Sequence, residues 1–162
     1  MKFTGSSQES DRPAFEIPHP LKAEHEKLHE TLNRATTEPG ELGEAASAVA
    51  TLMYPHFLKE EEYALPPLGL LRDLAQGPVI PGMWDVFALT DRLKAELDQM
   101  LAEHKSILAA AESLSTAARD ADKIEYVEFA QALTFHAQTE EEVLYPAAIL
   151  VGKYIRDKMG AV

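Results

Sequence analysis

Apolar residues recur every three or four positions over four long stretches of the chain, which is the spacing of an amphipathic helix. The four stretches are about residues 20–36, from Pro39-Gly40 to Pro66-Pro67, about residues 84–117 and about residues 122–158. No stretch shows the convincing alternation of a β-strand. We therefore predict an all-α fold, an antiparallel up-down-up-down four-helix bundle.

Proline and glycine residues mark where the predicted helices end. Short connections join the first helix to the second and the third to the fourth, and a longer one, about residues 65–83, links the two pairs. Residues 1–18 are rich in Ser, Gln and Pro and are predicted to form an N-terminal arm, with Phe15 and Ile17 as candidate packing contacts. Residues 19–160 are predicted to form the bundle as one domain.

The second helix pair repeats features of the first, which predicts an internal two-fold helix-pair repeat. The matched segments are Glu24-His25 with Glu103-His104, residues 56–62 with residues 136–142, and Pro66 with Pro146. The two histidines of a pair are 31 residues apart in the first half and 32 in the second. Such a pseudo-twofold places all four histidines at a similar depth in one bundle. Pro146 is also expected to kink or interrupt the fourth helix.

Each predicted helix carries one of these histidines on its apolar stripe: His25, His56, His104 and His136. In the second and fourth helices a glutamate, Glu60 or Glu140, follows four residues later. Position i+4 of an α-helix lies only about 40° from position i, so each glutamate points where its histidine points. The following glutamates, Glu61-Glu62 and Glu141-Glu142, rotate away and are expected to be mostly solvated.

Imidazole and carboxylate groups gathered inside a bundle indicate a metal site, because buried charge must be paired or bound to metal. A lone histidine on an apolar stripe is more often a hydrogen-bonded core residue, and a glutamate triplet is usually a surface feature. Here both residue types recur in register in both halves. These ligands suit Fe, Zn, Mn, Ni or Cu. Six or seven convergent ligands exceed the four of a closed zinc site, which favours a pair of ions.

The arrangement resembles the hemerythrin-like (HHE cation-binding) family in both spacing and helix placement. His25 stands in the first helix, His56xxxGlu60 in the second, His104 in the third and His136xxxGlu140 in the fourth, and the resemblance covers roughly residues 18–150. It implies a non-haem di-iron site of two iron ions with an oxo or hydroxo bridge, bridging glutamates and terminal histidines. It also implies a small ligand, O2, peroxide or NO, or the handling of iron.

His29 lies one helical turn after His25 and is a candidate seventh ligand. Hemerythrins carry an extra histidine one turn later on the third helix, where this chain has Leu108. If His29 binds, one iron is expected to have His25, His29 and His56, and the other His104 and His136. The vacancy for an exogenous ligand then lies on the second iron.

One departure from hemerythrins concerns the carboxylate after the last histidine. Hemerythrins place an aspartate five residues on, whereas this chain has Glu140 at four, which argues against reversible oxygen carriage. Storage or carriage of a ligand, sensing, a stress-related peroxidase or NO-handling activity, and iron donation remain open. These roles depend on redox potential and access rather than on ligand identity.

Composition narrows the function classes further. The chain of 162 residues has a net charge of −12, which disfavours binding to nucleic acid. It has no cysteine, which removes disulfides, iron–sulfur clusters and thiol catalysis. No run reaches the roughly 20 apolar residues of a membrane-spanning helix, and the N-terminus lacks the apolar segment of a secretory signal. We therefore expect a cytoplasmic protein that does not bind membranes.

Three alternatives compete with the di-iron interpretation. Residues 25–29, His-Glu-Lys-Leu-His, are a literal HExxH, the motif of zinc metallopeptidases, with Glu26 as the general base. That interpretation leaves the second repeat unexplained. Glu26xxHis29 is a single ligand motif of the ferritin-like kind, whose fold needs two. The remaining alternative is a metal-free bundle with a structural or partner-binding role.

Overall fold

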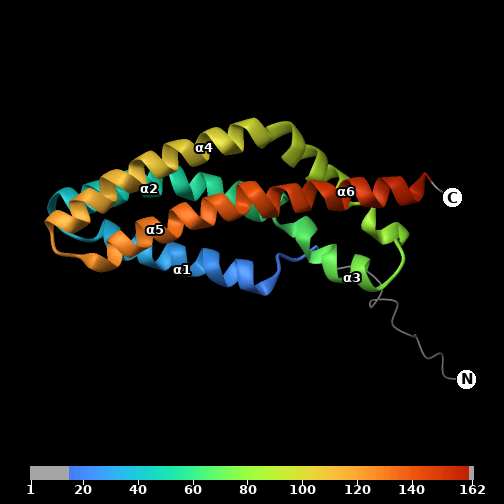
Figure 1. Ribbon diagram of the computed structural model, residues 1–162, viewed down its shortest axis with the longest axis horizontal. Coiled ribbons are helices and arrows are strands. Elements are labelled where there is room, and N and C mark those ends of the chain that lie inside the picture. Colours follow the sequence, from blue (N-terminus) through green and yellow to red (C-terminus); the bar gives the residue numbers. More distant parts are fainter. Residues whose placement is uncertain (1–14, 161–162) are drawn as a thin grey trace, which may run out of the picture.

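The computed structural model describes residues 15–160, and this part of the chain contains helices and loops without a strand (Figure 1). The elements are α1 (His19–Thr36), α2 (Gly40–Lys59), the π-helix η1 (Glu60–Ala64), the 3-10 helix η2 (Pro66–Leu70), α3 (Leu71–Gln76), the 3-10 helix η3 (Pro81–Met83), α4 (Val86–Asp120), α5 (Ile124–Thr139), the π-helix η4 (Glu140–Leu144) and α6 (Tyr145–Met159).

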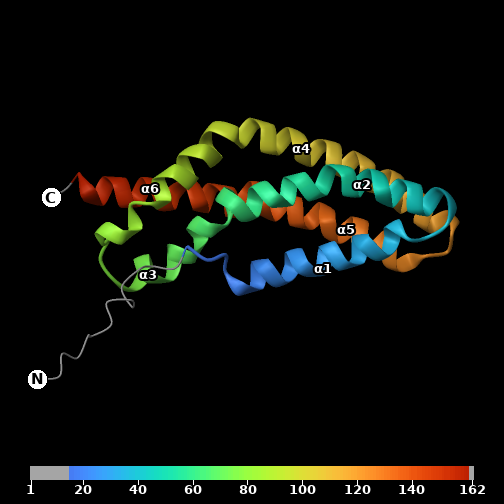
Figure 2. The same ribbon diagram turned by 180° about the vertical axis from the view of Figure 1, so that it is seen from behind.

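Helices α1, α2, α4 and α5 form an antiparallel four-helix bundle, as predicted. Successive helices run in opposite directions along the long axis of the molecule, and the view from behind shows the same order (Figures 1 and 2). Contacts join α1 to α2, α2 to α4, α4 to α5 and α5 back to α1, so the four helices enclose one interior. Residues 37–39 and 121–123 make the two short connections, and η2, α3 and η3 lie in the longer one.

Helix α6 continues the line of α5 past the end of α1 and α2 and packs against the first part of α4 (Figure 1). The two helices come close at Gly152, where an added Cβ would lie 2.3 Å from Thr90 Oγ1. Glycine at this position therefore permits the close approach of α6 to α4.

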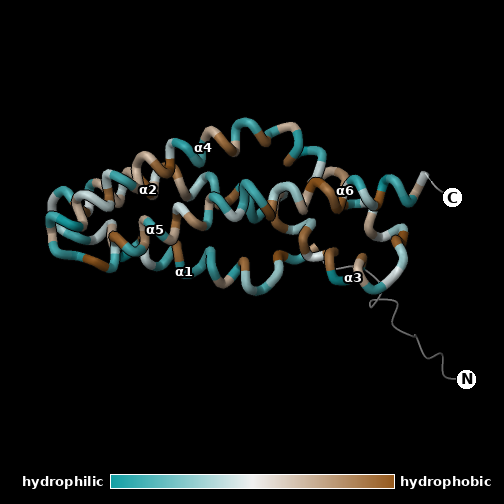
Figure 3. Tube along the Cα trace, viewed as in Figure 1, coloured by the Kyte–Doolittle hydropathy of each residue, from teal (hydrophilic) through white to brown (hydrophobic). Residues whose placement is uncertain are grey.

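Two hydrophobic clusters fill the bundle, one on each side of its middle. The first is formed by α1, α2, α4 and α5 and includes Leu32, Met53 and Leu114. The second is formed by η1, η2, α4 and α6 and includes Tyr63, Met100 and Tyr145. Hydrophobic and hydrophilic positions are interspersed along the helices (Figure 3). The amphipathic patterns thus build a hydrophobic core in two parts, separated at the middle of the bundle.

The predicted N-terminal arm is described only from residue 15 onwards. Ile17 packs against the second cluster and Phe15 against a third one, under α6 and the long connection, so both act as packing contacts as expected. The rest of the arm lies outside the described residues. Among residues 15–160, no helix combines the length and apolar character needed to cross a membrane.

The second and fourth predicted helices are not regular α-helices throughout, and the irregularity falls at matched positions in the two halves. The α-helical pattern changes to a π-helix at Glu60 in the first half and at Glu140 in the second. The N–H of the residue five positions on, Leu65 or Tyr145, donates to the carbonyl of that glutamate. Pro66 or Pro146 follows directly and lacks the N–H that would extend an α-helical ladder.

Candidate metal centre

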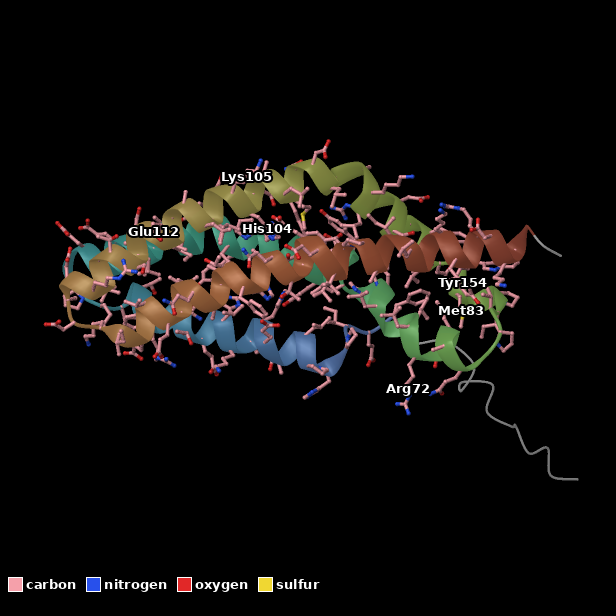
Figure 4. All side chains as sticks on the ribbon, in the orientation of Figure 1. Arg72, Met83, His104, Lys105, Glu112 and Tyr154 are labelled. Atoms are coloured by element: carbon pink, nitrogen blue, oxygen red, sulfur yellow. The ribbon has the colours of Figure 1, made fainter. Side chains whose placement is uncertain are left out.

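Six side chains that the sequence singled out meet at the middle of the bundle. The cluster consists of His25 from α1, His56 from α2, His104 from α4, His136 from α5, and Glu60 and Glu140 from the first residues of η1 and η4. All six are buried. Figure 4 places His104 on the inner side of α4, whereas its neighbour Lys105 lies on the outer side and is exposed. We call this group the six-residue cluster.

The imidazoles of the cluster form two pairs drawn from different halves of the repeat. The rings of His25 and His136 have centroids 5.0 Å apart, and those of His56 and His104 are 4.6 Å apart. The grouping expected if His29 were a ligand, His25 with His56 and His104 with His136, does not match these ring pairs. Each helix of a bundle touches two neighbours, and spacing along the chain does not tell which of them supplies the facing ring.

Each glutamate of the cluster divides its two oxygens between the two histidine pairs. Glu60 Oε1 lies 3.1 Å from His56 Nε2, and Glu60 Oε2 lies 3.6 Å from His25 Nε2. Glu140 does the same in the opposite sense: its Oε2 is 3.3 Å from His104 Nε2 and its Oε1 is 3.0 Å from His136 Nε2. Both carboxylates thus span the space between the pairs.

The other ring nitrogen of every histidine faces a second glutamate, and we call these four residues the outer carboxylates. The Nδ1 to Oε distances are 3.2 Å for His25–Glu61, 2.7 Å for His56–Glu103, 2.9 Å for His104–Glu141 and 3.3 Å for His136–Glu24. An Nδ1–H that donates to a carboxylate fixes the tautomer and leaves Nε2 free to bind a cation. Sequence reasoning missed this role for all four.

Glu61 and Glu141 were expected to be solvated, and this is only partly so. Their side chains are 46% and 37% exposed, yet each accepts a hydrogen bond from a buried imidazole. Each follows Glu60 or Glu140 by one residue, and its own carboxylate reaches the histidine of a neighbouring helix, His25 on α1 or His104 on α4. Glu62, by contrast, is exposed and pairs with Arg92.

Without a bound cation, the imidazoles of the cluster hold protons strongly because carboxylates surround them. Burial lowers the pKa of His104, but the carboxylates of Glu140 and Glu60 outweigh it and raise the pKa to about 10. Burial also lowers the pKa of His136, and Glu140 and Glu24 raise it to about 10. Burial raises the pKa of Glu140, but the facing imidazoles of His104 and His136 outweigh it and hold that pKa well below its usual range.

Three buried polar atoms of the cluster have no hydrogen-bond partner among the described residues: Glu60 Oε2, His136 Nε2 and Glu140 Oε2. Such orphaned atoms are rare in folded proteins because each costs the free energy of its lost hydration. All three belong to residues of the two groups whose ligand atoms lie within 4.8 Å of one another. Their lone pairs, with those of the other imidazoles, form a donor set that fits metal cations.

A sequence profile of the Hemerythrin HHE cation binding domain matches residues 17–148. The chain belongs to the hemerythrin HHE family. The match includes the whole six-residue cluster and ends inside α6. No curated protein and no solved structure gave a significant match. The predicted family and fold class are therefore confirmed, and the buried His/Glu group of this HHE domain could hold metal.

His29 is the one predicted ligand that the fold does not bring to the cluster. Its side chain is exposed, and its ring lies 4.5 Å from the ring of Tyr54. Phe57 stacks on His25 at 4.2 Å and lies 6.3 Å from His29. A seventh ligand at His29 does not fit this arrangement, because one helical turn moves the ring about 5.4 Å along α1, past the cluster.

The same placement argues against the peptidase interpretation of residues 25–29. A zinc-binding HExxH needs its two histidines to converge on one ion and its glutamate to face that ion. Here His25 is buried in the cluster while His29 and Glu26 are both exposed.

Tyr145 is a site residue that the sequence pattern did not suggest. Its side chain is fully buried, its hydroxyl donates to Glu60, and that oxygen lies 3.3 Å from His104 Nε2 and 3.5 Å from His56 Nε2. Burial, together with Glu60 and Glu140, raises the pKa of Tyr145 far above its ordinary value. On an α-helix, the residue five positions after Glu140 would be turned away by about 140°. The π turn closes from i to i+5 and brings it back.

Proposed function

We propose that this HHE-family protein holds two iron ions, bridged by Glu60 and Glu140, and uses them to bind O2, peroxide or NO or to handle iron. His25 and His136 would hold one ion, and His56 and His104 the other. When bound, the iron pair supplies redox chemistry and open coordination positions for a small ligand.

The division of carboxylate oxygens is the observation that carries this proposal. A single ion would be served by both oxygens of one carboxylate or by one oxygen alone. Both glutamates instead offer one oxygen to each histidine pair. Two ions, each with two imidazole nitrogens and two carboxylate oxygens, match this donor set and neutralise its buried charge.

The surrounding residues keep this donor set dry and correctly oriented. The outer carboxylates accept the Nδ1 protons and hold each imidazole with Nε2 directed inward. Phe57 stacks on His25 and belongs, with Leu133 and Ile107, to the hydrophobic cluster on one side of the six-residue cluster. Met100 belongs to the hydrophobic cluster on the other side. Exclusion of water strengthens every charge interaction within the site.

Nitrogen and oxygen donors suit several transition metals, so the donor set does not select one of them. The choice of iron rests on membership of the hemerythrin HHE family. Hemerythrin gives its name to the matching domain, whose description specifies only cation binding. The donor set also leaves room for exogenous ligands, because four protein donors for each ion fall short of the six positions of octahedral iron.

Metal analysis of the purified full chain tests the proposal directly. We expect about two irons per chain after anaerobic loading with Fe(II), and a new visible absorption on exposure to O2 or NO. Glu140→Ala should lose iron, whereas the control Glu142→Ala changes an exposed neighbour and should keep it. A wild-type chain that takes up no iron, with an unchanged helical fold, would favour the metal-free bundle.

A further inference from the structure

The two histidine pairs differ in what else they meet. The hydroxyl of Tyr145 lies against the His56–His104 pair, at 3.5 Å and 3.3 Å from the two Nε2 atoms. It also donates to Glu60, whose Oε1 is the oxygen presented to His56. The Tyr145 hydroxyl therefore lies at one end of the six-residue cluster and makes the cluster asymmetric.

The distances from the Tyr145 hydroxyl to the two imidazole nitrogens are compatible with donors that share one cation, whereas its shorter contact with Glu60 is a hydrogen bond. Two donors each about 2.1 Å from a cation lie about 3.0 Å apart at a right angle and about 3.4 Å apart at a tetrahedral angle. Tyr145 Oη lies within this range, or close to it, from both imidazole nitrogens. The contacts of His56 with Glu60, 3.1 Å, and of His104 with Glu140, 3.3 Å, fall in the same range.

The internal repeat shows that this donor is unique to one half. Tyr145 is the first residue after η4, and the matching residue after η1 is Leu65, which is also fully buried. Each donates its backbone N–H to the carbonyl of the glutamate five residues earlier. The backbone hydrogen bond is therefore the same in both halves. At this position, however, only the second half has a side chain that can bind a cation.

We propose that Tyr145 is a further metal ligand, bound through its phenolate oxygen to the ion held by His56 and His104. This inference rests on the proposed di-iron function. On binding, the phenol O–H bond breaks, the proton passes to water, and the oxygen lone pair forms the bond to the cation. The hydrogen bond that Tyr145 donates to Glu60 is lost in the exchange.

The consequence is a pair of ions with different numbers of open positions. The ion held by His56 and His104 has five protein donors, and the ion held by His25 and His136 has four. Of the six positions of octahedral iron, one would then stay open on the first ion and two on the second, so we expect an exogenous ligand such as azide or NO to bind preferentially at the ion of His25 and His136. The sequence-based expectation placed the open position near His104 instead, because it assigned the extra ligand to His29.

Vibrational spectroscopy of the iron-loaded full chain tests the assignment without using activity. Ferric iron bound by a phenolate has a visible charge-transfer band, and excitation in that band enhances the ring vibrations of the bound tyrosine. We expect both signals in the wild type, with the ring vibrations shifting when the chain contains ring-deuterated tyrosine. Tyr145→Phe should lose both signals and still bind about two irons per chain.

Tyr63→Phe is the matched control. Tyr63 is equally buried, but its hydroxyl donates to Glu96 at 2.7 Å, outside the six-residue cluster. This variant should keep the charge-transfer band. If Tyr145→Phe does not fold, the isotope shift in the wild type still decides whether a tyrosine is bound, and its persistence in Tyr63→Phe excludes the nearest alternative.

The outcomes separate this inference from the function on which it rests. A wild-type chain with about two ferric irons and no phenolate signal overturns Tyr145 as a ligand and leaves the di-iron proposal intact. A signal that persists in Tyr145→Phe also overturns the assignment. A wild-type chain that binds no iron overturns both proposals together.

Discussion

Neighbouring glutamates in each Glu-Glu-Glu run occupy different environments. The first, Glu60 or Glu140, is fully buried and divides its oxygens between two histidine pairs. The second, Glu61 or Glu141, is partly exposed and faces one Nδ1. Residues that are chemically identical and adjacent in sequence should therefore respond differently to the same substitution.

Replacing an inner glutamate is expected to lower iron content more than replacing one histidine. Glu60→Ala or Glu140→Ala removes oxygens from both histidine pairs, whereas His104→Ala removes one nitrogen from one pair. Iron per chain, measured by atomic emission after anaerobic loading and desalting, should fall furthest in the glutamate variants. Full iron occupancy in Glu60→Ala would contradict its bridging role.

Replacing an outer carboxylate should weaken metal binding without abolishing it. Glu141→Gln keeps a hydrogen-bond acceptor for His104 Nδ1 but removes the negative charge, and losses of this kind typically cost about 10–100-fold in metal affinity. Competition with a chelator measures the change. Glu142→Gln alters the same charge at the next, exposed position and should bind as the wild type does. Equal affinities for the two variants would mean that Glu141 has no orienting role.

At the scale of secondary-structure elements, the two π turns and the junction of α4 with α6 depart from a simple bundle. The π turns reposition the residues that follow the inner glutamates, including Tyr145. The α4–α6 junction extends the core past the ends of α1 and α2 and depends on a small residue at Gly152. Tyr145 begins α6, so packing of this helix also positions a site residue.

Gly152→Ala is expected to destabilise the protein. Alanine favours a helix over glycine by up to about 1 kcal/mol, but here its Cβ would overlap Thr90, and overpacking typically costs about 1–3 kcal/mol. Chemical denaturation should show a lower free energy of unfolding. At Gly160 an added Cβ would meet its nearest atom at 3.8 Å, so Gly160→Ala should show no such loss. A Gly152→Ala variant as stable as the wild type would contradict the close packing.

At the scale of the whole molecule, the bundle encloses a charged cluster between two hydrophobic ones. Without a cation, protonated imidazoles compensate the buried carboxylates. The stability of the metal-free protein is therefore linked to pH through the same residues that are proposed to bind metal.

The metal-free protein should lose stability as pH rises from about 6.5 towards 10. The pKa of His104 and of His136 is raised from 6.5 to about 10 in the folded chain. Their contribution is fully present below 6.5 and is lost as pH rises through about 10, because the folded state then releases protons that the unfolded state no longer binds. Thermal unfolding in the presence of chelator measures the slope, which should be shallower in His136→Gln. A stability that rises over this range would contradict the assignment.

Local periodicity was sufficient to predict the four helices, their order and the six-residue cluster. Residues four apart share a face of an α-helix, so a histidine and glutamate on an apolar stripe must both point into the bundle. The repeat then placed His25, His56, His104 and His136 at one level. These features depend on short-range geometry and on burial, both of which the order of residues encodes.

Tertiary structure alone decided which of these groups face one another. The pairing of His25 with His136 follows from the contact of α1 with α5, which no spacing along the chain specifies. His29 lies outside the cluster, at the surface, where its ring is 4.5 Å from that of Tyr54. Tyr145 reaches the cluster only because a π turn adds one residue to the helical repeat. An analysis that assumes an α-helical period predicts that Tyr145 faces away from the site.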